Sequence, residues 1–329
     1  MGEFELIERF FKRPARQADL GVGDDCALLS PRLGHQLALS ADALVEGRHF
    51  LSTVAPERLG HKCLAVNLSD LAACGAQPRA FLLSLTLPRA DAGWLQAFAQ
   101  GLFALADAHG CELVGGDTTQ GPLNIGITVI GDVPTGQALL RSGAHVGDDI
   151  YVSGQLGDAR LALEAFRGQM SLPEAVLNTC RMRMEQPTPR VELGTALRAV
   201  ANAAIDVSDG LLGDLGHILK RSGVGAQIDT TWLQAAGHFG EAHLPAGITP
   251  VLAELAWNKR LEFALSGGDD YELCFTAPVN QRELVHAAAW ETNTPVTRIG
   301  RITQELGLVV LDPQGQPIAK RFASFDHFA

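Results

Sequence analysis

Residues 113–133, LVGGDTTQGPLNIGITVIGDV, contain the features that decide the fold of this chain. An apolar run stops at two glycines, and Asp117 follows with two threonine hydroxyls behind it. The next apolar run, 123–133, begins after a turn that is too short for the crossover helix that joins parallel strands. We therefore expect several strands to be antiparallel, and we expect Asp117 to lie at a strand-to-turn junction.

The composition is that of a folded globular protein. The chain has 329 residues, of which 47% are hydrophobic and 19% are charged, and this length allows two domains of ordinary size. Its apolar runs stay well below the roughly 20 residues needed to cross a bilayer, and the N-terminal segment does not resemble a signal peptide. The six cysteines include no C-x-x-C pair, so they indicate neither a disulfide framework nor a zinc site. We expect a reduced, cytoplasmic protein.

The charge balance narrows the classes of ligand. The formal net charge is -11, and the sequence has no run of Lys or Arg, which argues against nucleic-acid binding through a basic face. We expect no membrane partner either. An anionic ligand would need cations other than side chains, and divalent metal ions are the obvious candidates.

Helical and strand-like stretches interleave, which predicts a mixed α/β or α+β fold. Apolar spacing of three and four predicts helices over residues 3–12, 56–74, 91–109, 156–167, 188–201, 210–222 and 279–291. Strand-like runs cover residues 36–41, 81–87, 123–133, 149–154, 203–208, 271–276, 297–303 and 307–312. A loop with Pro and Gly at 134–149 separates two halves, and we place the domains at 1–137 and 138–329.

One carboxylate pattern recurs at six sites: a small or apolar run, then Gly or Ser, then Asp. The acids are Asp24 with Asp25, Asp42, Asp70, Asp117, Asp206 with Asp209, and Asp269 with Asp270. Four sites look like strand-to-turn junctions, whereas Asp70 falls within an expected helix. Asp is a hard oxygen ligand suited to Mg²⁺. Taken singly, each site is better explained by the turn- and cap-forming preference of Asp, but six sites favour a shared metal-lined cleft.

Several familiar catalytic motifs do not occur in the sequence. It contains no G-x-x-x-x-G-K-[ST] loop and no G-x-G-x-x-G after a strand, so neither a P-loop nor a Rossmann dinucleotide site is supported. G-x-S-x-G and H-E-x-x-H are also missing.

Taken together, the motifs resemble those of the thiamine-monophosphate kinase family, within the aminoimidazole ribonucleotide synthetase-like superfamily. The matching stretches are GVGDDCALL, SADALVEGRHF, KCLAVNLSDLAACGAQP, LVGGDTTQGP, ALLRSGAHVGDDIYVSG, AIDVSDGLLGDLGHI, LSGGDDYELCFT and the terminal FDHF. They span nearly the whole chain. The resemblance implies a two-domain fold, with an N-terminal sheet domain that binds metal and ATP and forms a homodimer. A C-terminal α/β domain would complete the nucleotide and substrate site.

The resemblance also implies roles for individual residues. The metal positions are Asp25, Ser40, Ala41 (through its backbone), Asp42, Asp70, Asp117, Asp206 and Asp209. The ATP contacts are Gly116, Asp117, Arg141 and Ser208, and the substrate contacts are His49, Asp269 and Phe325. Two positions depart from the family pattern: Asp269 replaces a usual Glu, and Ala41 replaces a frequent Thr.

The implied reaction is ATP-dependent phosphorylation of thiamine monophosphate with several Mg²⁺ ions. Phosphoryl transfer needs positioning and charge neutralisation more than covalent catalysis. The acceptor phosphate has a second pKa of about 6, so it is largely a dianion at neutral pH and no catalytic base is expected. Phe325 would stack on a thiamine ring and Asp269 would attract the cation or the amine. Phe325 as a core aromatic, and His49 as a loop histidine held by the backbone, are equally open.

Two other functions remain open at the level of sequence. A synthetase or ligase on the same scaffold would use ATP to activate an amide oxygen or selenide. A metal-dependent phosphohydrolase would use the carboxylates alone. The VEGRHF and terminal DHF pieces favour the kinase.

Overall fold

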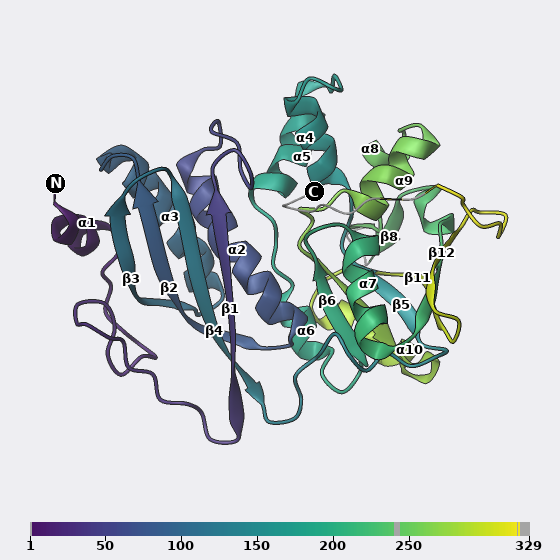
Figure 1. Ribbon diagram of the computed structural model, residues 1–329, viewed down its shortest axis with the longest axis horizontal. Helices are drawn as coiled ribbons and strands as arrows, with labels where there is room; N and C mark the ends of the chain where they lie inside the picture. Colours follow the sequence, from purple (N-terminus) through teal and green to yellow (C-terminus); the bar gives the residue numbers. More distant parts are fainter. Residues whose placement is uncertain (1, 240–243, 321, 323–329) are drawn as a thin grey trace. The chain divides into compact units, whose positions relative to one another are not determined.

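The computed structural model describes residues 2–239, 244–320 and 322, and the chain divides into two compact units (Figure 1). Unit 1 comprises Met1–Leu71, Ala76–Gly136 and Glu185–Pro187, and unit 2 comprises Ala72–Gly75, Gln137–Met184 and Thr188–Ala329. In the described part of the chain, no helix combines the length and the apolar character needed to span a membrane.

Unit 1 is built on a four-stranded sheet with the strand order β1-β4-β2-β3. Its elements are α1 (Glu3–Phe10), β1 (His35–Val45), α2 (Pro56–Ala73), β2 (Gln77–Leu87), α3 (Ala92–Ala108), β3 (Glu112–Gln120) and β4 (Asn124–Pro134). Strand β4 is antiparallel to both β1 and β2, whereas β2 and β3 are parallel and are joined through α3. The expected antiparallel pairing of the run 123–133 is confirmed, although its partners are β1 and β2 rather than the preceding strand.

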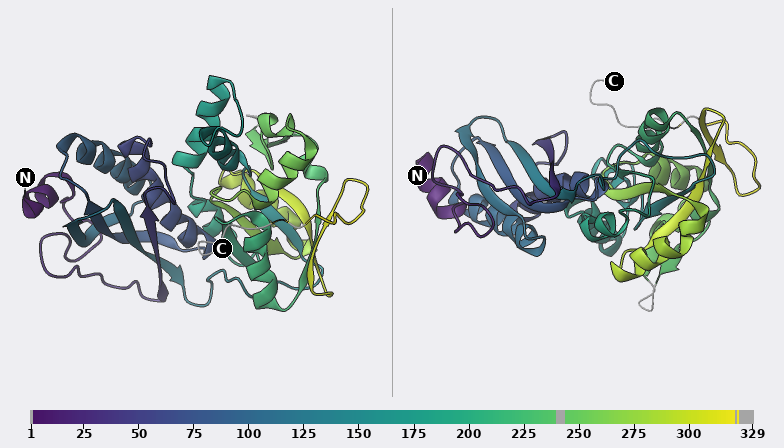
Figure 2. Two further views of the ribbon diagram at one scale, coloured as in Figure 1. Left: turned by 45° about the horizontal axis from the view of Figure 1, so that its top comes forward. Right: turned by 90° about the horizontal axis from the view of Figure 1, so that it is seen from below.

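Helices α2 and α3 cover one face of this sheet (Figure 2). Phe81 of β2 and Phe98 of α3 are completely buried there. The two helices approach to backbone contact because each carries a glycine at the crossing. A Cβ on Gly60 would lie 2.1 Å from the Phe98 carbonyl oxygen, and one on Gly101 would lie 1.8 Å from the Glu57 carbonyl oxygen.

The other face of the sheet keeps apolar side chains accessible. On the outer strand β1, Leu37 and Leu39 are 44% and 63% exposed. Leu39 pairs with Ile130 of β4, and Ala41 pairs with Thr128. Alternate residues of a strand point to opposite faces, so Leu37, Leu39 and Ala41 form a continuous apolar row on the open face.

Unit 2 is built on a six-stranded sheet with the order β12-β7-β11-β5-β10-β6 and a two-stranded sheet of β8 and β9. Its strands are β5 (Asp149–Ser153), β6 (Ala203–Val207), β7 (Gly225–Asp229), β8 (Gly237–Phe239), β9 (Leu244–Ala246), β10 (Glu272–Ala277), β11 (Val296–Thr303) and β12 (Gly307–Leu311). Its helices are α4 (Asp158–Phe166), α5 (Glu174–Glu185), α6 (Val191–Ala196), α7 (Leu211–Ser222), α8 (Pro250–Ala253), α9 (Trp257–Ser266) and α10 (Arg282–Glu291). Most neighbours in the larger sheet are antiparallel, and only β7 and β12 are parallel.

The core of unit 2 lies between this sheet and its helices. Helix α7 contacts β6 and β10, and α9 contacts both α7 and α4. Strands β5, β6 and β10 are buried along their whole length, which fits their near-continuous apolar sequences. Tyr151 of β5 stacks on Phe275 of β10 with ring centroids 5.2 Å apart.

All the expected helices and strands exist, and the structure adds elements that periodicity alone did not predict. Helix α5, with the sequence EAVLNTCRMRME, is largely polar, and β7 has only five residues. The helix expected over residues 188–201 is shorter in the structure, where α6 covers only Val191–Ala196. Pro189 lies just before α6 and has no backbone N–H to donate.

Candidate functional site

In unit 1, strand β1 and helix α2 bring polar side chains together. Ser40 and Asp42 are two residues apart on β1 and therefore point to the same face. Asn67 and Asp70 are three residues apart on α2 and are neighbours on one side of the helix. The Ser40 hydroxyl donates a short hydrogen bond to the Asp70 carboxylate, and the Asp42 backbone N–H donates to the Asn67 side-chain oxygen at 3.1 Å. Two expected metal positions, Ser40 and Asp70, are thus in direct contact.

Asn67 is a residue that the sequence interpretation did not single out. It is fully buried, and its side-chain NH₂ donates to the Cys63 carbonyl oxygen at 2.9 Å within α2. The amide therefore has a fixed orientation, and its oxygen holds the backbone of Asp42 in place. The signal was in the sequence: Asn67 lies one helical turn before Asp70 in NLSD.

The expectation that Asp117 marks a strand-to-turn junction is wrong, and the strand expected over residues 36–41 extends beyond Asp42. Asp42 lies within β1, which remains paired with β4 along its full length. Asp117 lies within β3, which continues through the two glycines and pairs with β2 as far as Gln120. The cross-strand partners decide this outcome, and the local turn preference of Gly and Asp does not.

Gly116 explains how β3 passes its glycine pair. Its φ of +139° is unfavourable for residues with a side chain, and a Cβ at this position would lie 1.9 Å from the Leu83 carbonyl oxygen of β2. The register is also irregular just before this point, between Leu113 and Gly115. Only glycine allows the two strands to approach so closely, and the next residue, Asp117, is exposed.

Asp42 and Asp117 lie too far apart within one chain to share a single metal ion. Asp117 pairs with Ser84 of β2, and Asp42 pairs with Ile127 of β4. Strands β1 and β3 are the two outer strands of the sheet, so three strand spacings, about 14 Å, separate them. This span is long compared with the roughly 2 Å metal–oxygen bonds of Mg²⁺.

The remaining expected residues of unit 1 lie on loops. Asp25 is exposed, and its backbone N–H donates to the Asp24 carboxylate at 2.9 Å. His49 follows β1, and its Nδ1 accepts from the Val45 backbone N–H at 2.9 Å. The histidine is thus held by the backbone, which fixes its ring beside the end of β1.

In unit 2, two distant motifs meet at the end of β6. The Asp269 backbone N–H donates to the Ser208 carbonyl oxygen at 2.7 Å, and the Tyr271 N–H donates to the Val207 carbonyl oxygen at 2.8 Å. Asp206, Ser208 and Asp209 therefore lie beside the turn that carries Asp269. Phe325, the third expected substrate contact, lies outside the described residues.

The turn at residues 267–271 adopts a demanding backbone conformation. Asp269 and Tyr271 have φ values of 63° and 51°, in the left-handed region that non-glycine residues seldom occupy. Backbone strain of this kind costs about 1–3 kcal/mol per residue and persists only where surrounding contacts impose it. Such strain is typical of functional sites, and here it accompanies the backbone hydrogen bonds of the turn to residues 207 and 208.

Asp214 of α7 supports the neighbouring loop. Its carboxylate accepts hydrogen bonds from the backbone N–H groups of Ser208 and Asp209, both at 3.1 Å. Burial, together with the nearby charge of Asp209, raises the pKa of Asp214 to about 7, although these backbone hydrogen bonds act in the opposite direction. Its contacts give Asp214 a structural role, because they hold the backbone of residues 208 and 209.

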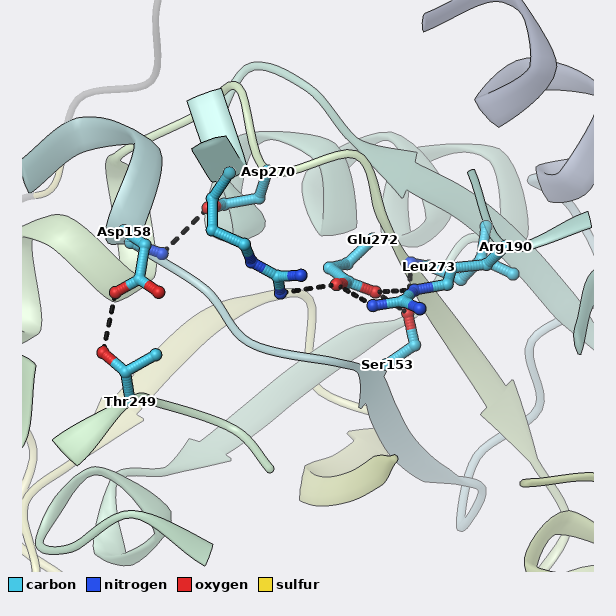
Figure 3. Close-up of polar contacts among 9 residues, drawn as sticks. Ser153, Asp158, Arg190, Thr249, Asp270, Glu272 and Leu273 are labelled. Atoms are coloured by element: carbon cyan, nitrogen blue, oxygen red, sulfur yellow. Dashed lines mark hydrogen bonds and ion pairs between the residues drawn. The ribbon is translucent and has the colours of Figure 1, made fainter. Parts of the chain in front are cut away.

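A buried charged network anchors the other side of the turn (Figure 3). Glu272 accepts two hydrogen bonds of 2.6 Å from Arg190, one of 3.3 Å from Arg183 and one of 2.6 Å from the Ser153 hydroxyl. Burial alone would raise the pKa of Glu272, but the two arginines and the hydroxyl outweigh burial and lower it. Glu272 is therefore a paired, charged group inside the unit.

Asp270 and Asp158 extend this network toward α4 (Figure 3). Asp270 accepts from the Gly157 backbone N–H at 2.9 Å, and Asp158 accepts from the Thr249 hydroxyl at 2.7 Å. Burial raises the pKa of both carboxyls, and that of Asp270 lies well above its usual range. These two acids therefore support the turn through their hydrogen bonds to Gly157 and Thr249.

Arg141 lies on the loop between β4 and β5, beside the C-terminal end of α7. It lines a cavity together with His217, Lys220 and Arg221. The sequence implied Arg141 alone as a cation near the nucleotide, and it gave no sign of the other three because they come from a segment some 80 residues away.

Residues 23–133 match the family described as AIR synthase related protein, N-terminal domain, and residues 145–312 match the corresponding C-terminal domain. The chain is 44% identical to the thiamine-monophosphate kinase of Escherichia coli (strain K12), an alignment that covers 100% of this chain and 98% of that protein.

Solved structures agree with these matches. The crystal structure of thiamine-monophosphate kinase from Stenotrophomonas maltophilia K279a aligns with a TM-score of 0.81 and 47% identity, covering 92% of each chain. The structure of AaThiL complexed with AMPPCP and TMP aligns with a TM-score of 0.72 and 30% identity, covering 91% of this chain and 89% of that one. The chain therefore belongs to the thiamine-monophosphate kinase family, with its two AIR synthase related domains, and it is a kinase.

Proposed function

We propose that this kinase transfers the γ-phosphoryl group of ATP directly and in line to thiamine monophosphate, in a Mg²⁺-dependent reaction that gives thiamine diphosphate. The single observation that carries the substrate pair is the likeness to AaThiL, whose structure contains AMPPCP, an analogue of ATP, together with TMP. The high identity to thiamine-monophosphate kinases over the full chain supports the same assignment.

The chemistry of the donor set fits Mg²⁺ bound jointly by the protein and the nucleotide. Across residues 2–239, 244–320 and 322, no group of three or more His, Cys, Asp or Glu side chains is placed to hold a metal ion. Mg²⁺ at nucleotide sites is usually held by one or two carboxylates, with phosphate oxygens and water completing its shell. The Ser40–Asp70 contact and the neighbouring Asp42 supply such a partial shell.

We assign the metal positions to Asp25, Ser40, the Ala41 backbone, Asp42, Asp70, Asp117, Asp206 and Asp209. Bound Mg²⁺ would neutralise the phosphates of the two substrates, which otherwise repel each other. Gly116 would contact the nucleotide through its exposed backbone on β3. Arg141 and Ser208 are the further nucleotide contacts, and residues 1–137 and 138–329 are the two functional domains.

The acceptor needs no catalytic base, because its phosphate is largely a dianion at neutral pH. The chain's own task is to orient the two substrates. We assign His49, Asp269 and Phe325 to the thiamine monophosphate. The turn at residues 267–271 supports the Asp269 assignment, since hydrogen bonds to β6 and the residue after it hold its backbone in place. The carboxylate would attract the thiazolium cation or bind the aminopyrimidine.

We also propose a homodimer that forms through the open face of the unit 1 sheet. The apolar row of Leu37, Leu39 and Ala41 supports this assignment, because a monomer would leave it in water. A Leu39→Lys variant should therefore become monomeric, as measured by sedimentation. We propose a cytoplasmic location, which suits a chain whose six cysteines are all free.

One assay tests the reaction. The purified chain is incubated with ATP, Mg²⁺ and thiamine monophosphate, and both ADP and thiamine diphosphate are quantified. We expect equal amounts of the two products, and no ADP when the monophosphate is omitted. ADP release without the monophosphate would support a phosphohydrolase instead, and ADP without thiamine diphosphate would support a synthetase or ligase.

A further inference from the structure

A cavity of about 520 Å³ in unit 2 is lined by four basic side chains: Arg141, His217, Lys220 and Arg221. Together they are called the cationic pocket. Among the residues that the structure describes, none that lines it is a carboxylate, although the chain as a whole has a formal net charge of -11. A concave surface lined by one sign of charge concentrates ligands of the opposite sign.

The periodicity of α7 places three of these side chains on one face. His217, Lys220 and Arg221 are related by spacings of three and four, so they are neighbours on the helix surface. The helix dipole favours cations in the last turn, which by itself accounts for Lys220 and Arg221. It does not account for a further arginine that arrives from a different segment.

The loop that carries Arg141 is tied to the end of α7 and to β6. The Ala144 backbone N–H donates to the Ser222 hydroxyl at 3.2 Å, and that hydroxyl donates to the Arg141 carbonyl oxygen at 3.4 Å. The Leu140 carbonyl oxygen accepts from the Ala204 N–H at 3.0 Å. These contacts fix the backbone of Arg141 beside Lys220 and Arg221, and repulsion opposes such a grouping of cations unless an anion is bound.

The cations of this pocket differ from those arginines of unit 2 that form ion pairs. Arg190 pairs with Glu272 and Arg282 pairs with Asp149. By contrast, the side chains that line the pocket form no ion pair with any part of the chain that the structure describes. Their charges therefore remain available to a ligand.

We propose that the cationic pocket binds the phosphate groups of the nucleotide, with Lys220 and Arg221 as specificity-determining contacts beside Arg141. The inference rests on the proposed function, in which Arg141 contacts ATP. ATP suits the pocket better than thiamine monophosphate does, because ATP carries more negative charge. The thiazolium cation of the other substrate would be repelled there.

The test compares Lys220→Ala, Arg221→Ala and the double variant with two controls. Lys220→Arg keeps the charge. Arg167→Ala removes an equal charge from an exposed position at the end of α4. The measurements are KM for each substrate and the dissociation constant of ADP by calorimetry at low and moderate salt.

We expect the double variant to raise both the KM for ATP and the Kd for ADP by at least about tenfold, equivalent to about 1.4 kcal/mol. The KM of the double variant for thiamine monophosphate should stay within about twofold of the wild-type value. In both control variants, the KM for each substrate and the Kd for ADP should also stay within about twofold. The wild-type affinity for ADP should fall with added salt, and the double variant should lose most of that dependence.

Unchanged ATP and ADP affinities in the double variant would overturn the proposal. A rise in the KM for thiamine monophosphate alone would also overturn it, because the pocket would then serve the acceptor. The ADP calorimetry needs no turnover, so it decides the pocket even if the wild-type chain forms no thiamine diphosphate and the proposed function fails.

Discussion

The proposed metal positions on the sheet of unit 1 and the acid that anchors the turn of unit 2 lie in opposite environments. In unit 1, Asp42 and Asp70 are only half-buried, and Asp117 is exposed on an outer strand. In unit 2, Glu272 is almost completely buried and is matched by two arginines. The comparison shows that acids in similar sequence motifs can have different roles, which depend on their burial. Accessible carboxylates can meet a hydrated cation, whereas buried carboxylates paired with arginine hold the backbone in place.

The largest effect is expected when the buried Glu272 is substituted. Glu272→Ala leaves Arg190 without its partner inside the unit, and removing one member of a buried ion pair typically costs about 3–5 kcal/mol. Urea denaturation should show this loss in the free energy of unfolding. The matched control is Glu262→Ala, which breaks the more exposed pair with Lys320 and should cost less than about 1 kcal/mol. Equal costs for the two variants would contradict the distinction.

Substitution of an accessible aspartate of unit 1 should lower the activity rather than the stability. Asp42→Asn should lower kcat by about 100- to 1000-fold, the range seen when a group that stabilises transition-state charge is removed. Its melting temperature should stay close to that of the wild type. Asp107→Asn, which changes an exposed acid paired with Arg13, is the control for charge. If Asp42→Asn retains activity with its fold intact, Asp42 is not a metal ligand.

The close approach of β3 and β2 predicts an effect of intermediate size. Gly116→Ala must accommodate both a left-handed φ and a collision with the Leu83 carbonyl oxygen. Gly136→Ala also has a positive φ, of 78°, but nothing lies within 4 Å of its Cβ. Gly136→Ala should therefore cost about 1–2 kcal/mol from conformation alone. Gly116→Ala should cost about 1–3 kcal/mol more, and similar costs would argue against the tight strand contact.

A smaller effect is expected on the free energy of unfolding at low pH. Burial would raise the pKa of Asp149, but its hydrogen bonds to Arg282 and Arg298 outweigh burial and lower it. Such a carboxylate stabilises the fold above its unfolded pKa of about 3.9, and this contribution disappears as the pH falls through the folded pKa. The free energy of unfolding should thus fall less steeply with acid in Asp149→Asn. An identical pH profile in the variant would show that Asp149 is not stabilised in this way.

The smallest effect should come from Asp269→Glu, which restores the residue that the family usually has. The backbone bond to Ser208 and the anchored turn are unchanged, so only one methylene group is added. The KM for thiamine monophosphate should change by less than about tenfold, and the KM for ATP should not change. Asp269→Asn, which removes the charge, should raise the KM for the monophosphate more than Asp269→Glu does.

Local sequence patterns predicted much of the fold because most elements carry their own periodicity. The run 123–133 was recognised as a strand from its apolar alternation, and residues 210–222 were recognised as a helix. Strand β3 was missed because Gly115 and Gly116 resemble a turn, and only its pairing with β2 makes it a strand. The neighbour of a strand is a long-range property that periodicity does not contain.

The candidate site was also only partly predictable from local sequence patterns. The acids themselves could be found from the recurring Gly-Asp and Ser-Asp motifs. Their environments could not, because these depend on contacts between distant segments. The Asp42 backbone meets Asn67 across 25 residues, and Asp270 accepts a hydrogen bond from Gly157 across 113 residues. The cationic pocket could not be predicted from the sequence for the same reason, because no run of basic residues indicates it.

Counting bound Mn²⁺ ions with AMPPCP present tests most directly whether the accessible aspartates hold cations for two phosphates. The wild type and Asp42→Asn would be titrated by electron paramagnetic resonance, with AMPPCP alone as the reference. We expect the wild-type chain to bind more ions than the nucleotide carries by itself, and Asp42→Asn to bind fewer than the wild type. Identical counts for the wild type, the variant and the nucleotide alone would contradict the account.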